Sequence, residues 1–219
     1  MRIFTYSPPS GIPPVIYEDA DYLAINKPSG LLSNPGIAEC THDCALTRLQ
    51  QAYGEVFLVH RLDCDTSGVM FFAKHKKAEG ALKKRLQHRE VHKTYMALTW
   101  GIPELSHGII DQPLAANPAD RPLQQVSATG KEAITAYTVL DSNPDKHCAL
   151  LKLEPTTGRT HQLRVHLHYL GHPILGDTFY GHEQCQAAKP RLCLHAEKVE
   201  FVQPLSQQAV EVLIPADFT

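Results

Sequence analysis

The densest group of reactive side chains in the sequence is the segment His60-Arg61-Leu62-Asp63-Cys64-Asp65-Thr66-Ser67-Gly68. Apolar runs at residues 56–59 and 69–73 flank it, which predicts a polar loop held between two strands. Two carboxylates so close in sequence could suggest the acid pair of a glycosidase, but sequence neighbours rarely straddle a sugar bond with opposed orientations. For Asp65, hydrogen bonding to the backbone of its own turn is the simpler interpretation.

A second group of reactive side chains occupies residues 156–166, Thr-Thr-Gly-Arg-Thr-His-Gln-Leu-Arg-Val-His. The spacing of Leu163, Leu167 and Leu170 predicts the buried stripe of a helix over residues 160–170. Arg164 then lies on a different helix face, together with His161. An arginine on a rigid helix is suited to bidentate binding of a carboxylate or a phosphate.

The remaining sequence supplies mainly strands that could position these two groups. Proline-rich residues 1–14 predict an irregular lead-in, and residues 15–219 a single catalytic domain. We expect an α+β fold with a mixed, largely antiparallel central sheet, flanking helices and loops, and one active-site cleft. Helices are predicted near residues 46–53, 78–86 and 160–170. Strands are predicted at residues 15–17, 22–26, 56–59, 69–73, 94–100, 132–140, 148–154, 193–201 and 209–214.

The composition excludes several classes of protein. Hydrophobic residues make up 43% of the 219 residues and charged residues 20%, which are globular values and argue against a disordered chain. No apolar run approaches the roughly 18 residues of a membrane span, and the first residues do not resemble a signal peptide. We therefore expect a soluble, cytoplasmic protein whose six cysteines are reduced thiols.

The charge is unevenly distributed along the chain. The formal net charge is only −2, but residues 74–93 contain eight Lys or Arg and two Glu, a local charge of +6. A local basic patch, rather than the total charge, decides where a polyanion can dock. The segment therefore predicts a surface for nucleic acid, although part of any charge run is simply solvated.

Several segments, taken in order, resemble the motifs of the RluA family of RNA pseudouridine synthases. The main one is His-Arg-Leu-Asp-x-x-Thr-Ser-Gly at residues 60–68. The others are Asn-Lys-Pro-Ser-Gly-Leu at 26–31, Lys-Thr-Tyr at 93–95, and residues 158–166, followed by Gly-His-Pro-Ile-Leu-Gly-Asp at 171–177. The resemblance covers residues 15–215 and shows no departure at a motif position.

The resemblance implies the pseudouridine synthase fold and the isomerisation of uridine to pseudouridine within RNA, without a cofactor or a metal. Asp63 matches the family's essential aspartate, which acts either as a nucleophile at C1′ or as a base at C2′. Tyr95 matches the active-site tyrosine, which stacks on the uracil. Arg164 matches the arginine that pairs with the aspartate and keeps it ionised.

The resemblance and the charge pattern also suggest RNA-binding residues. Arg61 is expected to fill the space that the flipped uridine leaves, or to contact a phosphate. The other expected substrate contacts are Lys27, Arg159, His161, Lys83, Lys84 and Arg85. The similarity is to the short type without an S4 domain, which implies 23S rRNA and tRNA anticodon stem-loops as substrates. We expect a monomer with no obligate protein partner.

Two other interpretations stay open from the residues alone. An RNA-loop binding protein or RNA chaperone could use the same fold without turnover, although the three catalytic residues argue against it. A zinc site at Cys40-Thr41-His42-Asp43-Cys44, completed by His60 or Cys64, lacks four ligands at recognised spacing. A metal site at His166, His168 and His172 is disfavoured because the first two lie two residues apart on a helix and diverge. We therefore predict no metal site.

Overall fold

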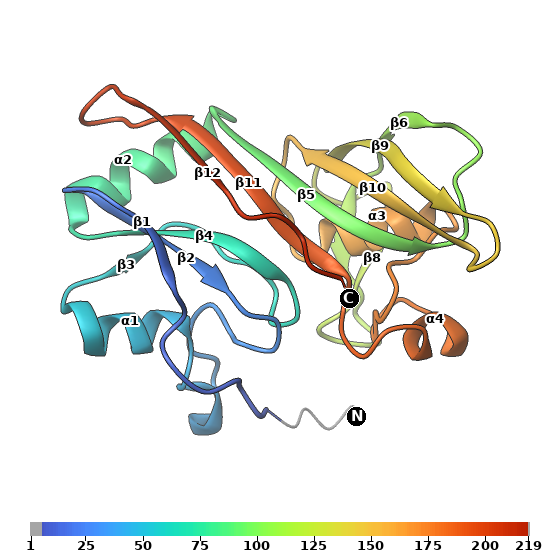
Figure 1. The fold of residues 1–219 in the computed structure, drawn as a ribbon, viewed down its shortest axis with the longest axis horizontal. Coiled ribbons are helices and arrows are strands. Elements are labelled where there is room, and N and C mark those ends of the chain that lie inside the picture. Colours follow the sequence, from blue (N-terminus) through green and yellow to red (C-terminus); the bar gives the residue numbers. More distant parts are fainter. Residues whose placement is uncertain (1–5, 219) are drawn as a thin grey trace. The chain divides into compact units, whose positions relative to one another are not determined.

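The computed structural model describes residues 6–218 and divides them into two compact units (Figure 1). The N-terminal unit comprises the chain up to Lys93 together with Ala196–Ala216. The central unit comprises Thr94–His195 and the chain end from Asp217. Residues 1–5 of the predicted lead-in lie outside the described residues, and residues 6–14 form neither helix nor strand.

The N-terminal unit is built on antiparallel strand pairs. Strand β2 pairs with β1 and with β4, β3 pairs with β4, and β12 pairs with β11. Two helices and one short 3-10 helix complete the unit. The elements are β1 (Val15–Glu18), β2 (Tyr22–Lys27), η1 (Glu39–Thr41), α1 (Ala45–Tyr53), β3 (Phe57–Leu58), β4 (Ser67–Ala73), α2 (Lys76–Gln87), β11 (Leu194–Val202) and β12 (Ala209–Leu213).

Strand β4 runs through the core of this unit, and all of its residues are buried. The Phe71 ring packs edge-on against the Phe201 ring of β11, at 5.1 Å between centroids. At the start of β4, Gly68 has a φ of 112°, and a Cβ atom there would lie 2.2 Å from the carbonyl oxygen of Ala196. Only glycine therefore fits at the position where the predicted polar loop enters the sheet.

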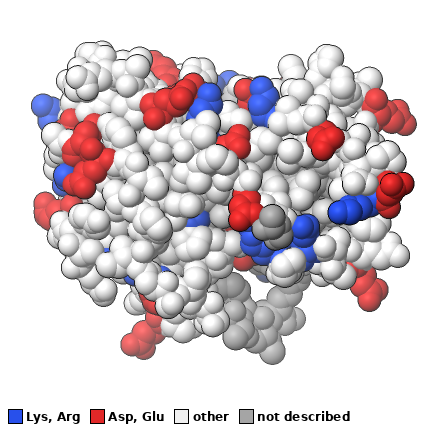
Figure 2. Space-filling view, viewed as in Figure 1, with Lys and Arg blue, Asp and Glu red and all other residues white. Residues whose placement is uncertain are grey.

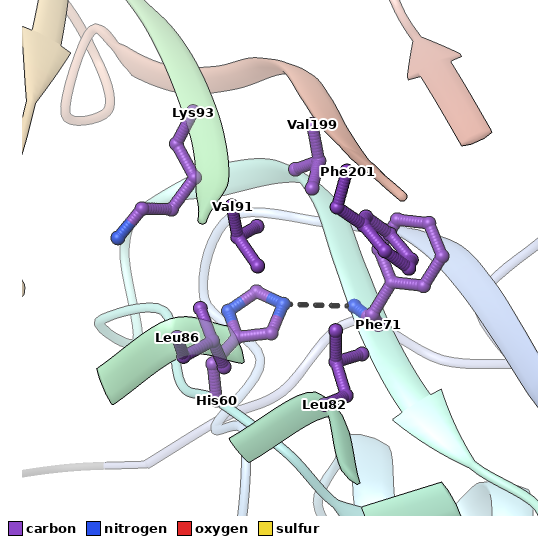
Figure 3. Close-up of a pocket in the computed structure, with 8 residues that line it drawn as sticks. All are labelled: His60, Phe71, Leu82, Leu86, Val91, Lys93, Val199 and Phe201. Carbon is purple, nitrogen blue, oxygen red and sulfur yellow. Dashed lines mark hydrogen bonds between the residues drawn. The ribbon is translucent and has the colours of Figure 1, made fainter. Parts of the chain in front are cut away.

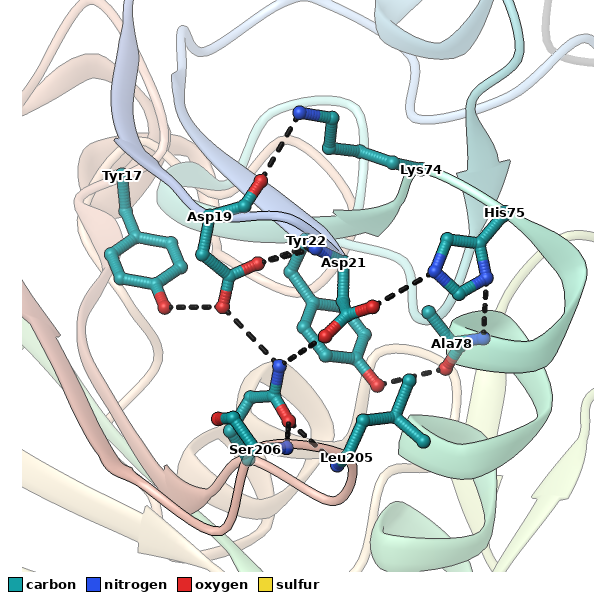
Figure 4. Close-up of polar contacts among 10 residues, drawn as sticks. Tyr17, Asp19, Asp21, Tyr22, Lys74, His75, Ala78, Leu205 and Ser206 are labelled. Atoms are coloured by element: carbon teal, nitrogen blue, oxygen red, sulfur yellow. Dashed lines mark hydrogen bonds and ion pairs between the residues drawn. The ribbon is translucent and has the colours of Figure 1, made fainter.

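A polar network fixes the start of α2 to the β1–β2 turn (Figure 4). Asp19 Oδ1 closes the turn by accepting the backbone N–H groups of Asp21 and Tyr22, at 2.8 and 2.6 Å. His75 Nδ1 accepts the Ala78 N–H at 3.2 Å and so caps the helix. Its Nε2 therefore carries the proton and donates to Asp21 Oδ1 at 2.9 Å.

The central unit contains a second run of antiparallel strands in the order β5-β10-β9-β6, and a small sheet of β7 and β8. Leu163 and Leu167 of α3 pack with Leu151 and Leu153 of β10 in its core. The elements are β5 (Val91–Trp100), β6 (His107–Asp111), β7 (Leu114–Ala116), β8 (Gln124–Val126), β9 (Ile134–Asn143), β10 (Cys148–Pro155), α3 (Gln162–Tyr169) and α4 (Glu183–Ala187).

The structure confirms the predicted α+β class with its largely antiparallel strands. Helix α3 differs in detail from the prediction. It begins at Gln162 rather than near residue 160, because His161 has a left-handed φ of 54°. Its buried surface also includes Arg164 and is not limited to a leucine stripe. The single catalytic domain and its one cleft stay predictions.

Two further properties of the described residues bear on the class of protein. None of their helices has the length and apolar character that a bilayer crossing requires. All six cysteines lie in residues 6–218 and are free thiols there.

Candidate active site

The Asp63 loop lies between β3 and β4, which pair through Phe57 with Ala73 and Leu58 with Phe72. The strands thus hold both ends of the loop, as the flanking apolar runs predicted. Asp63 is partly buried, and its carbonyl oxygen accepts the Thr66 N–H at 3.2 Å, which closes a tight turn.

Residues 26–31 form the support of this loop. Lys27 Nζ and the Gly30 N–H both bind the carbonyl oxygen of Cys64, at 2.9 and 3.0 Å. Ser29 Oγ donates to the carbonyl oxygen of Asp65 at 2.7 Å. The backbone directly after Asp63 is therefore fixed by three hydrogen bonds from one segment.

Ser33 fixes the backbone on the other side of Asp63. Its hydroxyl donates to the carbonyl oxygen of Leu62 at 2.6 Å and accepts the Leu62 N–H at 3.0 Å. A carboxylate on a loop anchored on both sides loses little further freedom when it reacts, which is what pre-organised catalysis requires.

The expected phosphate contact of Lys27 is wrong. The side chain is 0% exposed, and its ammonium donates to the carbonyl oxygens of Pro28, Leu31 and Cys64 at 2.9, 2.7 and 2.9 Å. These bonds use all three ammonium donors, so none is left for RNA. Burial lowers the pKa of Lys27 to about 8. Lys27 stabilises the Asp63 loop instead.

The prediction that the Asp65 side chain hydrogen-bonds the backbone of its own turn is wrong. The turn is closed by backbone groups, and Asp65 contributes only its carbonyl oxygen, to Ser29. Within residues 6–218 the Asp65 carboxylate accepts no hydrogen bond. Arg61, on the other side of Asp63, is exposed and so is available to RNA.

His60 lies in the wall of a small apolar pocket beneath α2 (Figure 3). Its Nε2 accepts the backbone N–H of Phe71 at 2.9 Å, which fixes the neutral tautomer. Burial, together with the positive charge of Lys93, lowers the pKa of His60 to about 3. The pocket has room for about one water molecule, so it cannot hold a nucleobase. His60 is therefore a structural residue of the motif.

Acidification is expected to destabilise the fold through His60. Its pKa falls from the usual 6.5 to about 3 on folding, so between these values the unfolded chain binds more protons. The stability is complete above pH 6.5 and is lost as the pH falls, by up to about 1.4 kcal/mol per pH unit. Urea unfolding at about pH 7, 6 and 5 measures this slope. His60→Gln should flatten it, and an unchanged slope would contradict the assignment.

Arg164 is held in the interior of the central unit. It is 2% exposed, and its Nε and Nη2 bind the two carboxylate oxygens of Asp177 at 2.9 and 2.6 Å. The guanidinium also lies over the rings of Phe179 and Tyr180, at 4.7 and 5.4 Å from their centroids. A bidentate pair between aromatic faces fixes its orientation closely.

Asp177, which the sequence reasoning did not identify, is a residue of the candidate site because it binds Arg164. It is fully buried, and its Oδ1 accepts the backbone N–H groups of Phe179 and Tyr180 at 2.9 and 3.2 Å as well as binding Arg164. The segment 171–177, which resembles a motif of the family, ends at this residue and could have indicated it from the sequence. Asp177 holds both the arginine and the turn that carries the two rings.

The segment before α3 positions two further candidate residues. His161 Nδ1 lies 2.7 Å from the Tyr180 hydroxyl, which fixes its ring at the helix start. Arg159 is exposed and uses its Nε to donate to the carbonyl oxygen of Glu132 at 2.8 Å. Gln162, which the sequence did not single out, accepts the Arg159 N–H at 3.0 Å and so shapes this turn.

Tyr95 lies on β5 opposite Leu153 of β10. The register is regular through this part of the strand, so Tyr95 and Met96 point to opposite faces, as predicted. Tyr95 is partly buried and packs against the core cluster that includes Leu163 and Leu167 of α3. Its ring therefore lies on the same sheet face as Leu153, its partner across the two strands.

The predicted basic patch is partly neutralised. Lys83 Nζ binds Glu79 at 2.7 Å, and Arg85 binds Glu90 at 2.5 Å. On the face seen in Figure 2, basic side chains likewise lie among acidic ones rather than in one block. Lys84 is exposed and forms no ion pair within residues 6–218. Of the three expected RNA contacts here, Lys83 and Arg85 are offset by an ion pair, whereas the positive charge of Lys84 is not.

The described part of the chain contains no group of three His, Cys, Asp or Glu side chains close enough to hold a metal ion. His166 is fully buried, and its two ring nitrogens contact Thr135 Oγ1 and the Gln112 carbonyl oxygen, at 2.9 and 3.0 Å. Both nitrogens are thus used in packing the central unit.

The candidate residues therefore fall into two groups. Asp63 and Arg61 share one anchored loop of the N-terminal unit. Tyr95, Arg159, His161 and Arg164 belong to the central unit. The Asp63 loop supplies a pre-organised carboxylate, and the central unit supplies an oriented guanidinium and a phenol ring.

Comparisons with known proteins agree, over most of the chain, with the family resemblance of the sequence motifs. Residues 21–169 match the family model described as RNA pseudouridylate synthase. The chain is 45% identical, over its whole length and 89% of the relative, to the dual-specificity RNA pseudouridine synthase RluA of Vibrio vulnificus (strain CMCP6). Identity to the protein of the same name from Pasteurella multocida (strain Pm70) is 42%, over the whole of both chains.

Solved structures agree with the sequence relatives. The human RNA pseudouridylate synthase domain containing 1 superposes with a TM-score of 0.79 at 28% identity, covering 95% of this chain and 86% of that one. The fold, the anchored aspartate loop and the full-length similarity lead to one conclusion. The chain belongs to the RNA pseudouridylate synthase family, and it is an enzyme that isomerises uridine in RNA.

Proposed function

We propose that the protein converts specific uridines to pseudouridine in 23S rRNA and in the anticodon stem-loops of tRNA. The observation that carries the proposal is the Asp63 loop, which hydrogen bonds from Lys27, Ser29 and Ser33 fix on both sides of the carboxylate. Relatives 42–45% identical carry the name of dual-specificity RNA pseudouridine synthases, which supports two classes of RNA substrate. Loop uridines are suitable targets because their bases can be splayed out at low cost.

In this proposal Asp63, Tyr95 and Arg164 act on the same uridine. The Asp63 carboxylate attacks C1′ or removes the C2′ proton, which releases the base from the sugar. The Tyr95 ring stacks on the detached uracil while it turns. C5 then bonds to C1′, either displacing the Asp63 carboxylate or adding to the glycal, whose C2′ takes back its proton. Loss of the C5 proton and protonation of N1 complete the isomerisation. Arg164, oriented by Asp177, supplies the positive charge that keeps the Asp63 carboxylate ionised.

RNA binding involves the exposed cationic side chains rather than the buried ones. Arg61 is exposed next to Asp63, so it is suited to fill the space of the flipped base. From the turn before α3, exposed Arg159 contributes a positive charge and half-buried His161 contributes its ring. We further propose that the enzyme works as a monomer in the cytoplasm, where both classes of RNA substrate occur.

The test is to map pseudouridine in 23S rRNA and tRNA transcripts incubated with the purified protein. The proposal expects new pseudouridine at loop positions in both classes of RNA. Modification of only one class would limit the substrate range. Tight binding of both RNAs without any product would favour the RNA-binding alternative over an enzyme of this specificity.

A further inference from the structure

Helix α2 presents four lysines on the side that faces solvent. Ala78 and Leu82 are buried beneath the helix, which leaves the opposite side exposed. Lys76 and Lys83 are seven residues apart, as are Lys77 and Lys84, so each pair forms a row along the helix, about 10.5 Å long. Gly80 lies between the two rows. We call these five residues the lysine face of α2.

The two rows differ in the charge they have available. Glu79 binds both Lys76 and Lys83, at 2.9 and 2.7 Å, and so offsets part of their charge. Lys77 and Lys84 form no ion pair within residues 6–218. The lysine face therefore keeps a net positive charge, and the row of Lys77 and Lys84 carries most of it.

Gly80 is a residue that the fold itself does not require. It lies within a regular helix and has no left-handed φ, and a Cβ atom placed on it would have no atom within 4 Å. A glycine inside a helix destabilises it relative to alanine. Neither packing nor backbone conformation explains why the helix gives up this stability at position 80. The absence of a side chain leaves open space at this position, so a ligand can approach the helix backbone between the lysines.

We propose that the lysine face of α2 binds the phosphodiester backbone of the substrate RNA, with the strand lying over Gly80. An ammonium group has three donors and acts as a point charge toward phosphate oxygens, which suits a contact without sequence preference. The polar network at His75 holds the helix start in place, so the lysines are presented on a fixed element. The inference rests on RNA being the substrate.

The first test removes positive charge from the row of Lys77 and Lys84, which carries most of the charge of the lysine face. The double variant Lys77→Gln/Lys84→Gln is expected to weaken binding of a labelled RNA stem-loop with loop uridines about tenfold. The slope of log Kd against log salt should become shallower by about 1.4 to 1.8, the loss of two phosphate contacts. The matched control is Lys131→Gln/Lys146→Gln, which removes two exposed lysines of the central unit. An equal loss in both double variants would mean that only net charge matters, and would overturn the proposal.

The second test places a side chain at position 80 and leaves the charge of the lysine face unchanged. Gly80→Ala is expected to raise Tm by about 2–4 °C, since alanine is the better helix former. Gly80→Gln places a long neutral side chain between the lysine rows, so it is expected to weaken RNA binding several-fold in a protein that stays folded. A Gly80→Gln variant that binds the stem-loop as tightly as the wild type would overturn the proposal.

Pseudouridine formation in the same RNA separates this inference from the proposed function. If the wild type modifies the RNA and the α2 variants bind it unchanged, the docking surface is wrong while the enzyme assignment stands. If the wild type forms no pseudouridine in any RNA, the proposed function itself fails. The supporting result is a raised KM with an unchanged kcat in the Lys77→Gln/Lys84→Gln variant.

Discussion

Replacing Asp63 with asparagine is expected to lower the rate of pseudouridine formation by at least about 10³-fold. The amide has nearly the size and shape of the carboxylate, but it can neither attack C1′ nor accept a proton from C2′. The loop should keep its conformation, because the hydrogen bonds that hold it come from Lys27, Ser29 and Ser33 and reach backbone atoms. Mass spectrometry of digested RNA measures the product.

The matched control for this variant is Asp65→Asn. Both positions lie in the same loop and lose one negative charge, but Asp65 contributes only its carbonyl oxygen to the hydrogen bonds of the loop. Its variant is expected to keep activity within a few fold of the wild type. RNA affinity should be similar in both variants, since phosphate contacts dominate it. Wild-type turnover by the Asp63→Asn variant would remove this residue from the mechanism.

Most strands were predictable from the sequence because their patterns are local. The runs around Val15–Glu18 and Tyr22–Lys27 are apolar and separated by a short acidic turn, and they form the antiparallel pair β1–β2. The flanks of the Asp63 loop form the two predicted strands, which pair with each other as β3 and β4. The short strands β6, β7 and β8 were not predicted, because three to five residues with mixed exposure carry too little periodicity.

The candidate site was predictable in its residue types but not in its partners. The motifs predict Asp63 and Arg164 as site residues, and one of them ends at Asp177, but the sequence does not indicate that Asp177 holds the arginine in a buried bidentate pair. Likewise Lys27 looks like any basic residue until its complete burial is known. Which charge pairs with which depends on contacts between residues distant in sequence, and local patterns do not contain that information.

Arg164→Met is expected to abolish activity and also to lower the free energy of unfolding by about 3–5 kcal/mol. The loss of stability follows from the structure: Asp177 is fully buried, and without the guanidinium its carboxylate loses the ion pair that it forms within residues 6–218. Lost activity in this variant alone would therefore be ambiguous, because misfolding would give the same result. Urea unfolding and RNA binding, the latter expected within a few fold of the wild type, show how much folded protein is present.

The double variant Arg164→Met/Asp177→Asn resolves this ambiguity. Asparagine removes the unpaired charge, while its Oδ1 can still accept the backbone N–H groups of Phe179 and Tyr180, so most of the lost stability should return. If Arg164 only supported the fold, activity would return together with stability. Because we assign it a role toward the Asp63 carboxylate, the double variant should be folded, bind RNA and still form no pseudouridine. The Asp177→Asn variant, which keeps the guanidinium, should retain measurable turnover wherever it is folded.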